Sequence, residues 1–155
     1  MPGINIRAME PADIEDSFNL IPSVASDFLF PTYSEEGKRE FKAKLGQIKS
    51  RLADKKYISF VAEDSGKIIG IVQGSIREGH ASLGLLFVDR RYHRNGVGTG
   101  LMEMAENQFR KEADVVKLSS SIYALEFYQR IGYAKTTGLR SKKGIVYYPM
   151  KKNLR

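Results

Sequence analysis

The stretch "YHRNGVGTGLMEMAENQFRK", Tyr92 to Lys111, places Gly96, Gly98 and Gly100 at the start of a strongly helical segment, directly after the hydrophobic run "LGLLFV". Glycine at such a position can form a tight turn, or it can let the backbone approach an anion closely. The first amides of a helix have no acceptor within the helix, and the helix dipole adds attraction for negative charge. The stretch therefore predicts a strand, a turn and a helix N-terminus suited to a pyrophosphate. The alternative is a flexible turn.

Arg90, Arg91 and Arg94 lie in that turn, where they either attract an anion or are simply solvated. Two better-known phosphate motifs are excluded. A dinucleotide fingerprint needs a third glycine where Leu101 or Glu103 stands, depending on which glycine begins the count. The phosphate loop of nucleotide hydrolases also requires a Gly-Lys pair followed by Ser or Thr, which this stretch lacks.

The composition limits the class of protein. A chain of 155 residues with 42% hydrophobic content is long enough for a sizeable core and short for two domains, so we expect one domain over residues 1–155. The net charge of +7 favours anionic partners. The absence of cysteine excludes disulfides, thiolate-bound metals and a cysteine nucleophile. With no long apolar run near the N-terminus, we expect no signal peptide, no membrane span and a cytoplasmic location.

Periodicity and turn residues predict a mixed order of strands and helices, β, α, α, β, β, β, α, β, α, β, β. The expected strands cover residues 4–8, 57–63, 67–76, 81–89, 113–121, 133–137 and 144–152. The expected helices cover residues 11–29, a segment that starts after Ser34 and continues to about Leu52, the segment after the glycines, and residues 122–132.

The glycine segment resembles the GCN5-related N-acetyltransferases, whose acetyl-CoA loop reads Arg or Gln, two residues, Gly, one residue, then Gly or Ala. "HRNGVG", His93 to Gly98, has both glycines and places His93 in the first position. A second match lies downstream in "SIYALEFYQRIGY", where Ser121 replaces the usual asparagine and Tyr133 the usual phenylalanine. The resemblance extends from about Ile4 to Met150. It implies an α/β fold of the α+β type, with a mixed, mostly antiparallel sheet flanked by helices and splayed at the cofactor cleft.

The resemblance also implies acetyl-CoA as cosubstrate, no metal, and direct acetyl transfer to a primary amine of a small molecule or peptide. It places Tyr128 as the general acid that protonates the departing sulfur, and a backbone amide near Phe87 or Val88 on the thioester carbonyl. The residues expected to bind the cofactor are Phe87, Val88, His93, Arg94, Asn95, Gly96, Val97, Gly98, Thr99, Ser121, Phe127 and Tyr128.

The general base stays open between Glu63, Glu78, His80 and a water molecule. The loop "FPTYSEEG" resembles the acceptor side of the family, where Tyr33, Glu35 and Glu36 can attract a cationic amine or simply begin a helix.

Other functions remain as alternatives. A catalytically silent member that senses acyl-CoA would explain the departures at His93 and Ser121. A basic nucleic-acid-binding module would use the turn arginines and the basic C-terminal segment, but no helix-turn-helix or RNA-binding aromatic signature accompanies them. A strand edge near the C-terminus would allow a homodimer.

Overall fold

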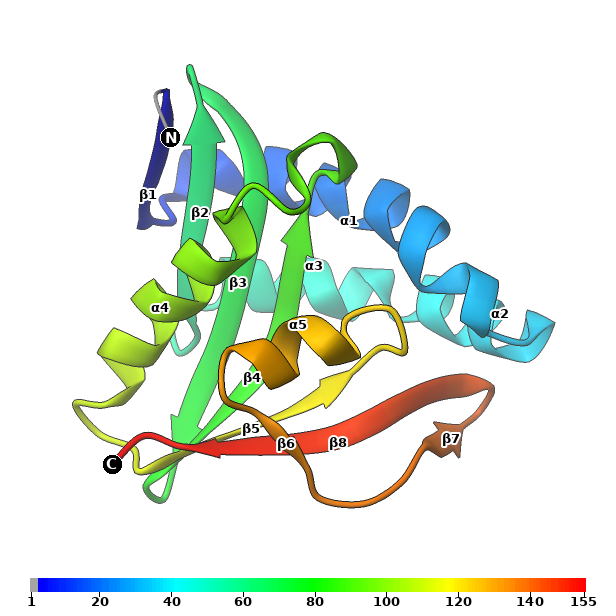
Figure 1. Ribbon diagram of the computed structural model, residues 1–155. Helices are drawn as coiled ribbons and strands as arrows, with labels where there is room; N and C mark the ends of the chain where they lie inside the picture. Colours follow the sequence, from blue (N-terminus) through cyan, green and yellow to red (C-terminus); the bar gives the residue numbers. More distant parts are fainter. Residues whose placement is uncertain (1–2) are drawn as a thin grey trace.

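An open sheet with helices on both faces forms the centre of the computed structural model, which describes residues 3–155 (Figure 1). The helices are α1 (Ile14–Phe28), α2 (Glu35–Ala43), α3 (Leu45–Ala53), α4 (Val97–Phe109) and α5 (Leu125–Arg130). The strands are β1 (Ile4–Ala8), β2 (Ile58–Asp64), β3 (Lys67–Arg77), β4 (His80–Val88), β5 (Val115–Ser120), β6 (Ala134–Lys135), β7 (Arg140–Lys142) and β8 (Ile145–Asn153). Within residues 3–155, no helix is both long and apolar enough to cross a membrane.

The strands follow the order β1-β2-β3-β4-β5-β8-β6, and β7 pairs with β8. Every pairing is antiparallel except β4 with β5, because α4 crosses over between these two strands and returns the chain in the same direction. The predicted α/β fold with a mixed, mostly antiparallel sheet is therefore confirmed.

The sheet opens where β4 leaves β5. The two strands pair over only four positions, from His80 with Val115 to Leu83 with Leu118. At that point β4 contains an extra residue, Gly84, because Leu83 pairs with Gly74 and Leu85 already pairs with Gln73. A bulge of this kind bends a strand and increases its twist. The last part of β4 consequently runs on to Val88 without a partner on the β5 side, which is the predicted splay.

Two hydrophobic cores lie on opposite faces of the sheet. On one face, Leu101 and Phe109 of α4 are fully buried over β3, together with residues from α5 and β8. On the other face, Ile21 and Ala25 of α1 pack with Leu52 of α3 against the sheet. These residues recur at helical spacing, so each helix buries one stripe. The arrangement holds α1 and α4 on either side of the opening between β4 and β5 (Figure 1).

The structure differs from the sequence prediction in two places. The expected long helix after Ser34 is two helices, because Lys44 has ψ −5° and ends α2 before α3 begins. The apolar residues Phe41, Leu45, Ile48 and Leu52 keep their helical spacing across this break, so periodicity alone gave no sign of it. In addition, β7 was not expected, since "RSK" has no apolar residue and forms a strand only by pairing with β8.

A buried carboxylate ties α4 to β8. Tyr133 donates its hydroxyl to Glu106 Oε2 at 2.8 Å, and Lys152 Nζ donates to Glu106 Oε1 at 2.7 Å. Glu106 is only 4% exposed, so these partners satisfy a charge that would otherwise be costly to bury. Because Tyr133 directly follows α5, the cluster also sets the position of that short helix relative to α4.

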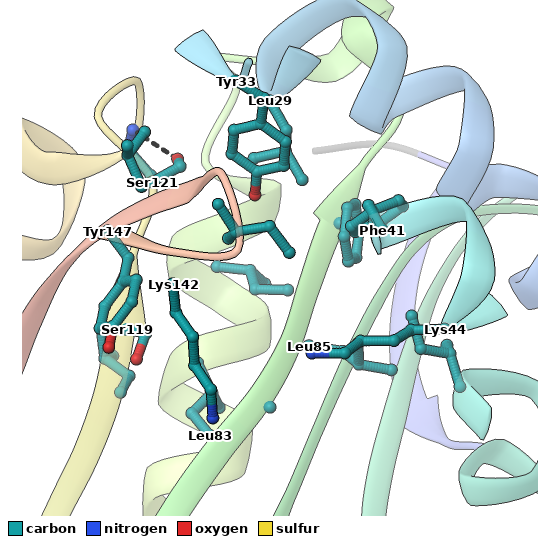
Figure 2. Close-up of a pocket in the computed structure, with 18 of the residues that line it drawn as sticks. Leu29, Tyr33, Phe41, Lys44, Leu83, Leu85, Ser119, Ser121, Lys142 and Tyr147 are labelled. Carbon is teal, nitrogen blue, oxygen red and sulfur yellow. Dashed lines mark hydrogen bonds between the residues drawn. The ribbon is translucent and has the colours of Figure 1, made fainter. Parts of the chain in front are cut away.

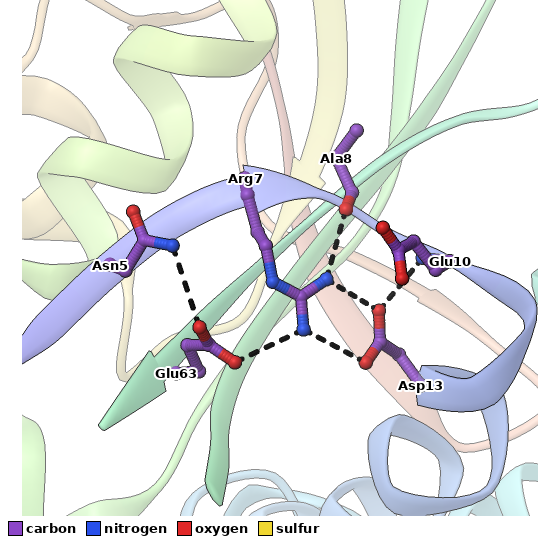
Figure 3. A network of polar contacts seen from close by, with 6 residues as sticks. All are labelled: Asn5, Arg7, Ala8, Glu10, Asp13 and Glu63. Atoms are coloured by element: carbon purple, nitrogen blue, oxygen red, sulfur yellow. Dashed lines mark hydrogen bonds and ion pairs between the residues drawn. The ribbon is translucent and has the colours of Figure 1, made fainter. Parts of the chain in front are cut away.

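A polar network joins β1, β2 and the start of α1 (Figure 3). Arg7 Nη1 and Nη2 donate to the two oxygens of Asp13 at 2.7 and 3.0 Å, and Nη2 also donates to Glu63 Oε2 at 3.1 Å. The bond from Arg7 is the main cause that lowers the pKa of Asp13, while burial of the carboxyl opposes it. The network fixes the turn by which the chain passes from the edge strand into α1.

We expect Asp13→Asn to lower the free energy of unfolding at neutral pH by about 1.5–3 kcal/mol, the range for hydrogen bonds to charged groups. The folded-state pKa of Asp13 lies below its ordinary value of 3.8, so this stabilisation is complete above 3.8 and is lost as the pH falls through the lower folded value. Urea unfolding of wild type and variant should therefore converge in acid. The exposed Glu112→Gln is the control, and equal losses in both variants at neutral pH would contradict the prediction.

Candidate active site

The three glycines of the opening stretch have three different roles. Gly96 precedes α4 with φ 82°, a left-handed conformation that favours glycine. A methyl group on Gly98 would lie 3.3 Å from Cζ of Phe127, across the mouth of a cavity that both residues line. Gly100 instead packs against β1, because a methyl group there would lie 2.5 Å from Cδ1 of Ile6. Two of the glycines therefore shape the cavity, and the third serves helix packing.

The cavity beside the glycines has a volume of about 800 Å³ and lies between the end of α1, the end of β4, the start of α4, and α5. It brings together ten of the twelve residues expected to bind the cofactor, namely Phe87, Val88, His93, Arg94, Gly96, Gly98, Thr99, Ser121, Phe127 and Tyr128. Asn95 and Val97 do not line it. The Val97 side chain is fully buried in the core, so only its backbone is available to a ligand.

His93 occupies the position where the related motif has Arg or Gln, and its ring is held by protein contacts. Nε2 lies 2.6 Å from the backbone oxygen of Val88; because a carbonyl only accepts, this nitrogen donates. In the neutral ring Nδ1 then accepts from the hydroxyl of Tyr123 at 3.1 Å. The imidazole also stacks on Phe28 with ring centroids 4.4 Å apart. The imidazole thus joins the loop to β4, α1 and the β5–α5 connection.

Phe28 and Tyr123 were missed as site residues. Their ring centroids lie 4.4 Å apart in a stacked arrangement, and both residues line the cavity beside the glycines. Phe28 does continue the apolar face of α1, seven residues after Ile21, so its partly buried position was predictable. Nothing local to the sequence indicated that Tyr123 would meet it across the opening.

Of the three arginines in the turn, only Arg94 lines the cavity. Arg91 Nη2 pairs with Asp89 Oδ2 at 3.0 Å, and Arg90 Nη1 lies 3.6 Å from Asp27 Oδ2. The charges of Arg90 and Arg91 are therefore already paired with carboxylates. Of the three arginines, only Arg94 could attract an anion in the cavity.

Ser121 stands where the related motif has asparagine, and it lines the cavity while closing the turn before α5. Its Oγ accepts from the backbone amide of Ala124 at 3.1 Å. The hydroxyl proton of Ser121 is therefore still available for a ligand.

Tyr128 lies in α5, and its ring packs edge-on against Phe127 and Tyr133, with centroids 5.2 and 5.7 Å away. The side chain is 6% exposed, and burial raises the pKa of its phenol above the ordinary value of 10.0. Tyr128 therefore keeps its proton at neutral pH and can act as a donor but not as a base.

A second cavity of about 370 Å³ lies on the other side of Tyr128, between the α2–α3 junction, β4, β5 and the β7–β8 hairpin (Figure 2). Both cavities are lined by the same six residues at their junction, which are Leu29, Leu86, Phe87, Ser121, Ala124 and Tyr128. The β7–β8 hairpin that lines this cavity packs closely on α2, since any side chain on Gly37 of α2 would collide with the backbone of Gly144 in the hairpin turn.

The residues proposed from the sequence as a general base lie elsewhere. Glu63 is bound to Arg7, while Glu78 and His80 flank the turn between β3 and β4. None of the three lines either cavity. Of the acids expected on the acceptor side, Glu35 pairs with Lys38 at 3.0 Å and neither Glu35 nor Glu36 lines the smaller cavity. Within residues 3–155, no Asp, Glu or His side chain lines it, and no cluster of three or more such residues could hold a metal ion.

Comparison with known structures identifies the same architecture. A Thermoplasma acidophilum PaiA N-acetyltransferase in complex with coenzyme A superposes with a TM-score of 0.82 at 18% identity, covering 97% of this chain and 98% of that one. An aminoglycoside 6'-N-acetyltransferase complexed with coenzyme A gives 0.75 at 14% identity, with 97% of each chain covered. Ard1 from Thermoplasma volcanium gives 0.74 at 21% identity, again with 97% of each chain covered.

Similarity at this level of identity establishes the fold, and the family follows from the sequence. The family model described as the acetyltransferase (GNAT) domain matches residues 29–154. The matched segment contains the glycine loop, the end of β4 and Tyr128, which are the parts that form the two cavities. Since the match covers well over half of the chain, this protein belongs to the GCN5-related N-acetyltransferase (GNAT) family.

Proposed function

We propose that this protein is an N-acetyltransferase that moves an acetyl group from acetyl-CoA directly to a primary amine, with Tyr128 as the general acid. The observation that carries the proposal is the junction of the two cavities at Tyr128 and Phe87. One cavity has the glycine loop and the other lies on the acceptor side of the sheet. Two reactants held in them would meet beside a buried phenol, and such alignment is a large part of catalysis.

Residues of the larger cavity suit acetyl-CoA. The backbone amides after Gly96 and the charge of Arg94 would hold the pyrophosphate. The end of β4, from Leu85 to Val88, pairs with β3 on one side and has no partner on the β5 side, where it would offer its backbone to the pantetheine amides as to an added strand. The two neighbours solved with coenzyme A support this choice of cosubstrate. When bound, acetyl-CoA would supply an acetyl group activated as a thioester.

In the transfer a C–N bond forms and the C–S bond breaks. The amine nitrogen loses one proton and the sulfur gains one, which Tyr128 Oη would supply. With no Asp, Glu or His on the smaller cavity in residues 3–155, we assign removal of the amine proton to water. A route through a cysteine acyl-enzyme is excluded, because the chain has no cysteine.

The proposal is tested by titrating the protein with acetyl-CoA in a calorimeter and then measuring release of CoA thiol with a panel of amines. We expect saturable binding and thiol release that depends on an amine. Saturable binding without turnover on any amine would instead favour an acyl-CoA sensor. Absence of binding would remove the acetyl-CoA assignment altogether.

A further inference from the structure

The smaller cavity is lined by three cationic side chains, which come from three separate elements. Lys44 lies at the α2–α3 junction, Arg51 on α3 and Lys142 on β7. Figure 2 shows Lys142 extending from the hairpin down into the pocket, while Lys44 approaches from the opposite side. No carboxylate of residues 3–155 lines the same cavity.

These charges are poorly compensated by the rest of the protein. Within residues 3–155, neither Arg51 nor Lys142 takes part in an ion pair. Lys44 has one partner, Glu40, with the Nζ to Oε1 distance at 3.5 Å. The pocket therefore presents a positive field to whatever enters it, and converging field lines in a cleft raise the local concentration of anions.

The remaining lining defines what else the ligand must match. Leu29, Phe41 and Ile145 form apolar walls, and the hydroxyls of Tyr33 and Tyr147 add neutral polar groups. Burial raises the pKa of Tyr33, so its hydroxyl is neutral at physiological pH. A volume of about 370 Å³ suits a small molecule with an apolar part.

We infer that the acceptor is a small amine that also carries an anionic group, a carboxylate or a phosphate, bound by Lys44, Arg51 and Lys142. This inference rests on the proposed function and specifies its substrate class. Polycationic acceptors, such as the aminoglycosides named for one structural neighbour, would be repelled by the same charges.

The positive lining is also consistent with the lack of a base in the cavity. Nearby cations disfavour an ammonium ion and lower its pKa. The ammonium group of a bound acceptor would therefore lose its proton to water more readily in this cavity than in bulk solvent.

The experiment compares matched amines by steady-state kinetics and by calorimetry in the presence of CoA. The pairs are leucine with leucinol, which has a similar amine basicity, and phosphoethanolamine with ethanolamine; spermidine represents the polycations. We expect the acid of at least one pair to have a KM at least tenfold below that of its uncharged partner, and to bind more tightly. The pair with the larger ratio of KM values, uncharged partner to acid, shows whether the cavity prefers a carboxylate or a phosphate.

The variant Arg51→Gln combined with Lys142→Gln should raise the KM for the preferred acid at least tenfold, leaving kcat and acetyl-CoA affinity within twofold. Lys151→Gln removes the same kind of charge from an exposed position on β8 and should change nothing. The inference is overturned if spermidine or the uncharged partners are the better substrates, or if the double variant keeps the wild-type KM. Calorimetry tests this inference separately from the proposed function, because tighter binding of the anionic amines would be seen even if the protein catalysed no acetyl transfer.

Discussion

Replacement of Gly98 by tryptophan is expected to weaken acetyl-CoA binding at least about 100-fold, equivalent to about 2.8 kcal/mol. Gly98 lines the larger cavity in the first turn of α4, and a single methyl group there would already lie 3.3 Å from Phe127. An indole at this position would fill the space beside the amides proposed to hold the pyrophosphate. Calorimetric titration with acetyl-CoA measures the loss directly.

Gly100→Ala is the matched control for this experiment. It adds a side chain two residues further along the same helix, where the new methyl group would contact Ile6 of β1 and not the cavity. We expect lower thermal stability from this crowding and unchanged acetyl-CoA affinity. Circular dichroism shows whether each variant is folded, and Gly98→Val offers a smaller obstruction if the tryptophan variant is not. A folded Gly98 variant with wild-type affinity would show that this loop does not hold the cofactor.

Tyr128→Phe should lower kcat about 100-fold, at the lower end of the range of about 10²–10⁴ for general acid catalysis. The substitution removes only the hydroxyl and keeps the ring contacts with Phe127 and Tyr133. We therefore expect the affinity for acetyl-CoA to stay within twofold of wild type. Stopped assays of thiol release at saturating acetyl-CoA give kcat for both proteins.

The pH dependence provides a second measure of the same group. Because burial raises the pKa of Tyr128 above its ordinary value of 10.0, the donor remains protonated through the alkaline range. The wild-type rate should rise as the amine loses its proton and then stay level up to pH 10. Tyr133→Phe is the control, since its hydroxyl bonds Glu106 and lines neither cavity. Wild-type turnover in Tyr128→Phe would remove the assignment of the acid.

Local patterns predicted most of the elements and most of the residues that line the larger cavity. Gly96, Gly98 and Tyr128 lie within short motifs. Their positions were predictable because the start of a helix, or a short helix, depends mainly on residues that are neighbours in the sequence. The alternation in β2 and β3 and the helical spacing in α1 likewise reflect the face that each element buries. The break at Lys44 was missed because the apolar spacing continues across it, and the strand β7 was missed because it forms only by pairing with β8.

The smaller cavity could not be predicted in the same way. The sequence left open whether Glu35 and Glu36 attract a cationic amine or simply begin a helix. They begin α2 outside the cavity, which is lined instead by Lys44, Arg51 and Lys142. Arg51 and Lys142 lie 91 positions apart in the chain, on elements whose meeting depends on the pairing of β7 with β8 and the packing of α3.

The sequence by itself therefore determined the order of most of the elements, the glycine-rich start of α4 and the position of Tyr128 within α5. These depend on backbone conformation and periodicity over a few residues, which side-chain type controls directly. Only the tertiary structure decided that β4 separates from β5 at Gly84, that two cavities meet at Tyr128, and that cations surround the smaller one. Such features arise from strand register and from helix packing between distant segments, which no short stretch of sequence specifies.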